Sequence, residues 1–234
     1  DGWNYIGYLP QEAQPITDAL ASLPLVELDY VKSQLSSATY YDGVGWFGSL
    51  TEMQPGEGYM VRMANPGTLQ YPDASSKKSV VMTNELPGRD LNPHDYRYSG
   101  TVTAKVFMDG ALSGSREDKL LAYVDGELRG EVKGRYFQPE DAYAFQMLIY
   151  SNVSSGEEVS FKYYHAASGQ TYECKETLPF REDMIVANAY ESFDLHVVAV
   201  HGNRGIPAEA GFRLQTYPNP FSDRLHIAVT IKEP

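Results

Sequence analysis

The chain has 234 residues, and 19 basic against 31 acidic side chains give a formal net charge of −12 with histidine neutral. This excess of acid excludes a broad nucleic-acid-binding face, which needs clustered lysine and arginine, and it disfavours docking on an anionic membrane surface. Hydrophobic residues make up 42% of the chain, enough to build a core, and no apolar run reaches the length of about 18 residues that a membrane-spanning helix needs.

Residues 1–75 are predicted to form a small β-rich module with one helix. Apolar residues recur at helical spacing from Ile16 to Leu23 and Pro24 follows them, so the helix is expected over 15–23. Asp42-Gly43 predicts a hairpin turn. Strands are expected where aromatic and apolar residues alternate, at 3–9, 38–41, 46–50, 59–63 and 68–71.

A change of pattern follows the module. Residues 76–98 are rich in Pro, Ser, Lys, Asp and Asn and are predicted to be a linker that contains one short strand at 80–82. Residues 99–201 show period-two alternation with turn signals about every ten residues, which predicts an antiparallel β-sandwich of the immunoglobulin-like kind. Its expected strands are 102–108, 120–124, 129–133, 143–150, 158–164, 170–176 and 194–200, with a polar loop at 109–118.

Residues 202–234 are expected to be a linker followed by one or two strands. Pro218 and Pro220 fix a non-helical corner around Asn219, and the alternating run over 225–231 predicts a strand. One or two strands cannot bury a core of their own. The predicted fold class is therefore mainly β throughout, with one short helix.

The last region resembles a known secretion signal. Tyr217-Pro218-Asn219-Pro220-Phe221, followed by an alternating strand, is similar to the start of the C-terminal sorting domain of the type IX secretion system in Bacteroidetes. That domain continues with further strands, so the chain is expected to carry its truncated start. The resemblance implies an extracellular or outer-membrane-surface location, and the type IX machinery as a partner of the complete domain.

Two further segments resemble modules of large surface proteins from the same bacteria. The glycine- and aromatic-rich stretches at 2–8, 45–50 and 53–60 are similar to a small module of such proteins. The stretches at 120–130 and 159–164 are similar to the β-sandwich that precedes a sorting domain in many of them. Relatives often carry a cysteine where Leu128 stands here. None of these families brings a catalytic residue to transfer.

Few residue patterns suggest bond-making chemistry. Cys174 and His165 could form a nucleophile and base only if the fold brings them within hydrogen-bond reach, and a strand cysteine beside a strand-end histidine is the alternative. The five histidines show no zinc-ligand spacing. A hydrolase using the carboxylates of Asp118, Glu127 and Glu131 would need them at a defined separation. The chain is therefore predicted not to be an enzyme.

Calcium is the metal ion that the sequence best suits. The loop over 109–118 supplies the carboxylates of Asp109, Glu117 and Asp118 together with serine hydroxyls, and oxygen ligands of this kind bind Ca²⁺. Arg116 lies inside the loop, and the spacing fits no EF-hand. A solvated turn is the alternative interpretation.

Sugar binding is the small-ligand hypothesis. Aromatic rings can stack on the apolar face of a sugar while carboxylates and amides bind its hydroxyl groups. The alternative for an aromatic residue in a small β-module is a place in the core. The candidate ligand-binding residues are Trp3, Tyr40, Tyr41, Trp46 and Tyr59.

These observations predict a non-catalytic interaction or spacer region of a secreted or cell-surface protein, with a glycan or a surface protein as its partner. A carbohydrate-binding module appended to an upstream hydrolase is the alternative function. No nucleic acid, membrane-spanning segment or cofactor other than calcium is expected.

Overall fold

The computed structural model of the chain describes residues 2–72, 91–198, 212–217 and 226–231. Among the described residues, strands hold 54% and helices 6%, and this part of the chain has one short α-helix and mainly antiparallel sheets, which confirms the predicted fold class: mainly β. The chain forms two compact units, Asp1–Val198 and Ala199–Pro234. The predicted linker at 76–98 lies mostly outside the described residues.

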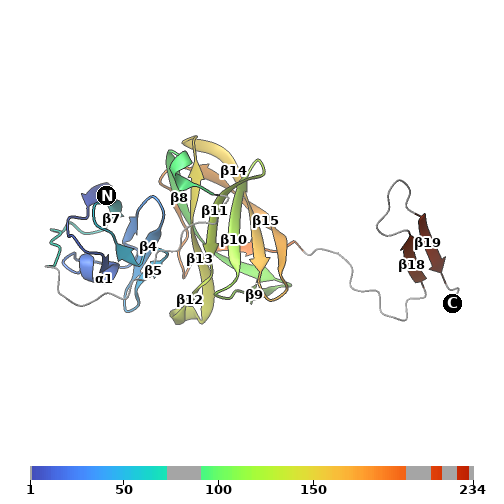
Figure 1. Ribbon diagram of the computed structural model, residues 1–234. Helices are drawn as coiled ribbons and strands as arrows, with labels where there is room; N and C mark the ends of the chain where they lie inside the picture. Colours follow the sequence, from blue (N-terminus) through green and yellow to red (C-terminus); the bar gives the residue numbers. More distant parts are fainter. Residues whose placement is uncertain (1, 73–90, 199–211, 218–225, 232–234) are drawn as a thin grey trace. The chain divides into compact units, whose positions relative to one another are not determined.

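A five-stranded antiparallel sheet, in the order β1-β7-β3-β4-β5, organises the first module (Figure 1). The core of this module includes the buried side chains of Tyr8, Leu20, Val31 and Tyr59. A separate two-residue ladder joins β2 (Gln14–Pro15) to β6 (Glu52–Met53). The strands of the main sheet are β1 (Trp3–Gly7), β3 (Tyr30–Lys32), β4 (Ser37–Tyr41), β5 (Gly45–Gly48) and β7 (Gly58–Arg62).

Two predicted elements of the module differ from the structure. The helix α1 covers only Ile16–Ala19, because beyond it the N–H groups of Ala21 and Leu23 donate to carbonyls three residues back, in tighter turns, before Pro24. The expected strand at 68–71 is an irregular segment. The structure also adds β3, a three-residue strand too short to show a period.

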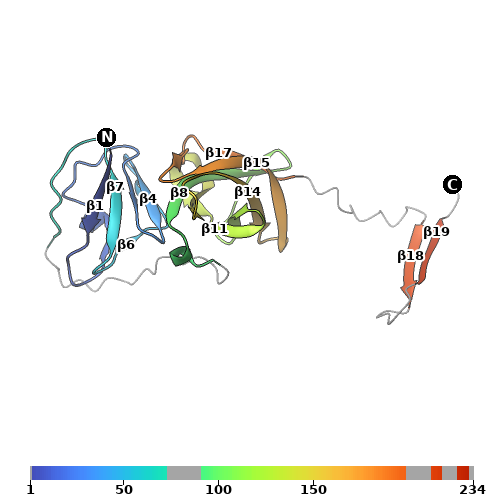
Figure 2. The same ribbon diagram turned by 90° about the horizontal axis from the view of Figure 1, so that it is seen from above.

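Two facing sheets form the β-sandwich, one in the order β11-β10-β14-β15 and the other in the order β12-β13-β8-β16 (Figure 2). Strands β9 and β17 also pair with β8. Two 3-10 turns are η1 (Pro93–Asp95) and η2 (Gln138–Glu140). The strands are β8 (Tyr98–Met108), β9 (Ala111–Ser113), β10 (Lys119–Val124), β11 (Glu127–Lys133), β12 (Arg135–Phe137), β13 (Ala142–Ser151), β14 (Ser155–His165), β15 (Gln170–Arg181), β16 (Ile185–Val186) and β17 (Phe193–His196).

Alternation along the strands places the core as predicted. Every second residue of β8 and β10 faces the opposite sheet and is buried, and these residues are Val102, Ala104, Val106, Leu120, Ala122 and Val124. The hairpin between β10 and β11 turns at Asp125-Gly126, with φ values of 49° and 82°, as the type I′ turn chemistry of this dipeptide requires.

Two details of the sandwich differ from the sequence pattern, although its fold class is confirmed. The expected loop at 109–118 contains a hairpin, because Asp109-Gly110 turns with φ values of 52° and 79° and sends β9 back along β8. The sheets are also not wholly antiparallel. The chain crosses from β15 to the other sheet and reaches β8 in the same direction, so β16 and β17 pair with it in parallel.

The module and the sandwich belong to one compact unit. Rings of Tyr41 and Phe47 from the module pack with Phe137 and Ala189 of the sandwich. Polar contacts reinforce this apolar cluster: Tyr30 Oη lies 2.5 Å from Thr101 Oγ1, Gln146 Nε2 donates to Ser37 Oγ (3.1 Å) and Tyr150 Oη donates to Gln34 O (2.8 Å). Buried polar groups that satisfy one another fix the register of two surfaces.

The second compact unit contains one hairpin within the described residues. Strand β18 (Phe212–Tyr217) pairs antiparallel with β19 (His226–Ile231). The alternation of the sequence predicted β19 but did not mark β18 as a strand. Within the predicted sorting motif, Tyr217 ends β18, whereas Pro218, Asn219, Pro220 and Phe221 lie outside the described residues.

Candidate ligand-binding groove

A groove of about 580 Å³ lies where strands β1 and β7 of the module meet the segment that leads into β8. We call it the tyrosine groove, after Tyr5, Tyr59, Tyr96, Tyr98 and Tyr150, which line it. Its volume falls within the range of about 300 to 1,000 Å³ that is typical of small-ligand sites. Polar lining comes from Lys32, Ser33, Gln34, Arg97 and Ser99.

Stacked planar groups form one wall of the groove. The Tyr96 ring lies 6.1 Å from the Tyr150 ring, centroid to centroid, at an interplanar angle of 27°. The Arg129 guanidinium lies over the Tyr96 ring at 5.0 Å. Such cation–π and stacking contacts hold a ring at a fixed angle, so this wall is preorganised.

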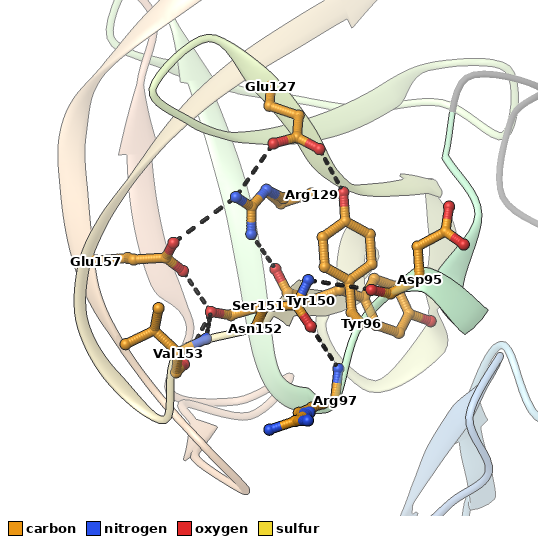
Figure 3. A network of polar contacts seen from close by, with 10 residues as sticks. All are labelled: Asp95, Tyr96, Arg97, Glu127, Arg129, Tyr150, Ser151, Asn152, Val153 and Glu157. Atoms are coloured by element: carbon orange, nitrogen blue, oxygen red, sulfur yellow. Dashed lines mark hydrogen bonds and ion pairs between the residues drawn. The ribbon is translucent and has the colours of Figure 1, made fainter.

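A polar network behind the wall holds Arg129 in place (Figure 3). The Arg129 side chain reaches Glu127 (3.2 Å), Glu157 (3.7 Å) and the carbonyl of Tyr150 (3.3 Å). Arg129 is only 9% exposed, so these groups rather than water are the main partners of its charge, although its buried Nε has no hydrogen-bond partner among the described residues. The Tyr96 hydroxyl donates to Glu127 at 2.7 Å, which joins the ring to the same network.

Asn152 anchors the chain segment that carries Tyr96 and Tyr98. Its side-chain amide donates to Asp95 O (3.0 Å) and accepts from the Arg97 N–H (3.1 Å). One side chain therefore supplies both a donor and an acceptor to an extended backbone, as a neighbouring strand would. Figure 3 shows these contacts beside the Arg129 network.

The wall tyrosines are neutral hydrogen-bonding platforms. Burial, followed by the hydrogen bond to Glu127, raises the pKa of Tyr96 to about 12. Burial also raises the pKa of Tyr150 well above its ordinary value. Both phenols therefore stay protonated in neutral solution, and their rings can stack on a ligand without adding charge.

Tyr5 forms the open side of the groove. It lies on β1, the edge strand of the module sheet, and its side chain is 78% exposed. A large aromatic ring so exposed adds little to the core and is available for contact with a ligand. The groove thus combines a fixed aromatic wall with a solvent-facing aromatic ring.

The predicted sugar-binding aromatics do not gather at one place. Tyr41 is buried in the junction with the sandwich, and Tyr59 is buried in the module core although its edge reaches the groove. Tyr40 and Trp46 are half-buried against each other, with ring centroids 5.4 Å apart. Trp3 contacts Tyr30 edge-on and lies 5.1 Å from the Lys32 ammonium.

The predicted calcium ligands have separate positions. Asp109 occupies the corner of the β8–β9 hairpin, and Glu117 is 3.8 Å from Lys133. Asp118 is buried, and its two carboxylate oxygens accept from Tyr163 Oη (2.6 Å) and Ala166 N–H (2.8 Å). Over the described ranges, no three His, Cys, Asp or Glu side chains come together as a metal site.

The residues considered for catalysis are each held by partners of their own. Burial, with smaller effects of Glu176 and Glu173, raises the pKa of the Cys174 thiol to about 12. The His165 ring contacts Ser168 at 3.0 Å. Of the carboxylates, Glu127 bonds Tyr96 and Arg129, and Glu131 pairs with Lys119 at 2.7 Å.

Sequence reasoning missed most of the groove. Tyr96 and Tyr98 fall in the stretch interpreted as a linker, and Tyr150 was assigned only to a strand. The signal was present as alternating aromatics at the end of that linker, since a solvated linker seldom carries two tyrosines two residues apart. The pairing of these residues with Tyr5 depends on tertiary structure and has no sequence signal.

No helix in the described residues is long and apolar enough to cross a membrane. Comparisons with protein-family models, curated proteins and solved structures find no match to this chain.

Proposed function

We propose that the chain is a non-catalytic binding region of an exported or cell-surface protein, with the tyrosine groove as its binding site and a carbohydrate as its ligand. The observation that carries this proposal is the groove itself, which is lined by a pair of stacked tyrosine rings, by the exposed ring of Tyr5 and by several hydrogen-bonding side chains. Planar aromatic faces beside amides and hydroxyls suit a sugar ring, which has apolar C–H faces and polar edges.

A binding role fits the way the polar residues are used. The aromatic wall is held in place by the side chains of Arg129, Glu127 and Glu157. The buried carboxylate of Asp118 holds Tyr163 and the backbone of Ala166. These groups stabilise strands and rings, which is what a rigid binding module needs.

A glycan-array screen of the chain, followed by calorimetry on the oligosaccharides it retains, tests the binding proposal. Tyr5→Ala should weaken binding of a retained oligosaccharide by about fivefold or more, because loss of one stacking ring costs about 1 kcal/mol or more. Tyr136→Ala, which removes another exposed tyrosine that does not line the groove, should leave binding unchanged. Retention of no oligosaccharide, or equal loss in both variants, would contradict the proposal.

The second part of the proposal concerns the cellular location of the parent protein, and it rests on the sequence of the last region. Tyr217-Pro218-Asn219-Pro220-Phe221 and the strand that follows resemble the start of a type IX sorting domain. The test deletes everything from residue 212 onward in the full-length parent, expressed in a bacterium that has this secretion system. The parent should then accumulate in the periplasm, and unchanged export would refute the assignment.

The interaction of the groove with a surface protein instead of a glycan is the competing interpretation. An extended peptide could lie beside Tyr5 along the edge of β1 that pairs with no other strand among the described residues. The stacked ring wall and the small, compact groove favour a sugar. If the chain captures a peptide and retains no oligosaccharide, the result would support binding of a surface protein.

A further inference from the structure

The charge lining of the tyrosine groove differs from that of the rest of the chain. The sequence holds 31 acidic residues and has a net charge of −12. None of the groove-lining residues is an aspartate or a glutamate, whereas Lys32 and Arg97 both line it. At physiological ionic strength the Debye length is about 8 Å, so the nearest charges dominate the field that a bound ligand meets.

Lys32 is already committed to other groups. Its ammonium is 2.7 Å from Asp183 Oδ1 and donates to Ser99 O (3.2 Å) and Ser99 Oγ (3.1 Å). These three acceptors match the three donors of an ammonium group. Lys32 therefore ties the module to the sandwich, and its charge is neutralised locally.

Arg97 is the available cation. It is exposed and lines the groove between Tyr96 and Tyr98. Its backbone N–H is fixed by Asn152 at 3.1 Å, and Figure 3 shows its guanidinium directed away from the carboxylates of Glu127 and Glu157. In the described part of the chain no hydrogen bond or ion pair is found for this guanidinium.

We infer that the groove selects an acidic sugar, with Arg97 binding the carboxylate or sulfate of the ligand while the tyrosines contact its ring. A guanidinium presents paired N–H donors that match a carboxylate or a sulfate in two parallel hydrogen bonds. This inference rests on the proposed carbohydrate function and adds the chemical class of the ligand. Arg97 would be the specificity-determining residue, and Tyr5 would contribute to acidic and neutral sugars alike.

Matched oligosaccharides test the inference. The array carries uronic-acid, sialic-acid and sulfated oligosaccharides together with their neutral counterparts, and each uronic acid is also present as its methyl ester, which keeps the ring and removes the charge. The wild-type chain should bind acidic members at least about tenfold more tightly than their neutral forms, because charge-assisted hydrogen bonds are about twice as strong as neutral ones. The carboxylated and sulfated arms distinguish the two sources of anionic charge.

Variants of Arg97 then locate the selectivity. Arg97→Ala should abolish the acidic preference while neutral binding remains, and Arg97→Lys should keep only part of it, because an ammonium lacks the paired donor geometry. Arg116→Ala, which removes an exposed arginine that does not line the groove, is the matched control and should change nothing.

The two possible negative results lead to different conclusions. Equal binding of acidic and neutral sugars, or a preference that survives Arg97→Ala, would overturn the inference and leave the carbohydrate function standing. Retention of no sugar at all, including the case in which only an acidic peptide is captured, would overturn both.

Discussion

Arg129 shows how one residue connects stability to the groove. Its side chain is buried, and it meets two carboxylates, a backbone carbonyl and the face of Tyr96. A buried cation of this kind is costly to desolvate and adds stability only while its partners remain. Its first role is therefore geometric: it fixes the angle of the Tyr96 ring.

Arg129→Met should lower the free energy of unfolding by about 3 kcal/mol, because it leaves Glu157 in a largely buried site without its cation. Urea denaturation followed by tyrosine fluorescence measures the change. The triple variant Arg129→Met, Glu127→Gln, Glu157→Gln should recover part of the loss, since no unpaired charge then remains. A triple variant less stable than Arg129→Met would contradict this account.

At the scale of strands, Gly130 sets how closely two sheets approach. A Cβ atom at this position of β11 would lie 2.7 Å from the carbonyl oxygen of Leu148 and 3.0 Å from the sulfur of Met147, both on β13. Contacts that short require the backbone to move. The glycine is thus needed for the close packing of β11 on β13.

Gly130→Ala should lower the free energy of unfolding by about 1 to 3 kcal/mol, the usual cost of overpacking a core. Gly7→Ala is the matched control, because it lies in strand β1 with no atom within 4 Å of the added Cβ. Thermal unfolding of the two variants should therefore give clearly different midpoints. Equal midpoints would show that β11 can shift freely.

The end of the sandwich contains a pH-sensitive contact between strands. Glu176 on β15 accepts from the His196 N–H (2.7 Å) and lies 2.8 Å from the His196 ring nitrogen. Burial acts to raise the pKa of Glu176, but these hydrogen bonds outweigh it and hold the pKa below the ordinary value of 4.5. A carboxyl with a lowered folded pKa stabilises the fold at higher pH and loses that contribution on protonation.

The attachment of β17 to β15 should therefore be complete above pH 4.5 and should weaken as the pH falls further through the folded pKa of Glu176. Hydrogen exchange of the His196 and Val198 amides, corrected for intrinsic rates, measures this opening. Glu176→Gln should remove the pH dependence at these two amides. Protection that falls with pH in the variant as in the wild type would assign the effect to another group.

The fold of the whole molecule was predictable as far as local patterns specify it. Alternation located the sandwich strands and their inward faces, and the Asp125-Gly126 dipeptide located a hairpin. The same signal at Asp109-Gly110 was read as a loop, although it turns a hairpin. Short strands such as β3 and β16 were missed because two or three residues show no period.

The groove was far less predictable than the fold. Its walls combine β1, the segment after η1 and β13, which are far apart in the sequence. Individual aromatics such as Trp3 and Trp46 stood out by composition, yet side-chain burial depends on packing that composition does not specify. Arg97 carries no motif at all, and the inference about it depends on its place in the groove lining and on the absence, among the described residues, of a hydrogen bond or ion pair to its guanidinium.

Cooperative unfolding of the module and the sandwich is a property of the whole molecule, because it depends on the junction between the two parts. Phe137 is fully buried, and its ring meets Tyr41 and Phe47 of the module at 5.0 and 5.2 Å between centroids. Tyr41 also accepts from the Ala189 N–H at 2.7 Å. An apolar junction reinforced by buried hydrogen bonds should make the two parts unfold together.

Calorimetry of the chain should accordingly show one transition covering both the module and the sandwich. Phe137→Ala should cost about 3 to 5 kcal/mol, as for other buried phenylalanines, and should split the transition in two, because the ring it removes joins the two cores. Phe161→Ala, in the sandwich core away from the junction, should cost a similar amount without splitting the transition. Two transitions in the wild-type chain would mean that the junction does not couple the parts, and the groove between them would then lack the fixed geometry on which its binding role depends.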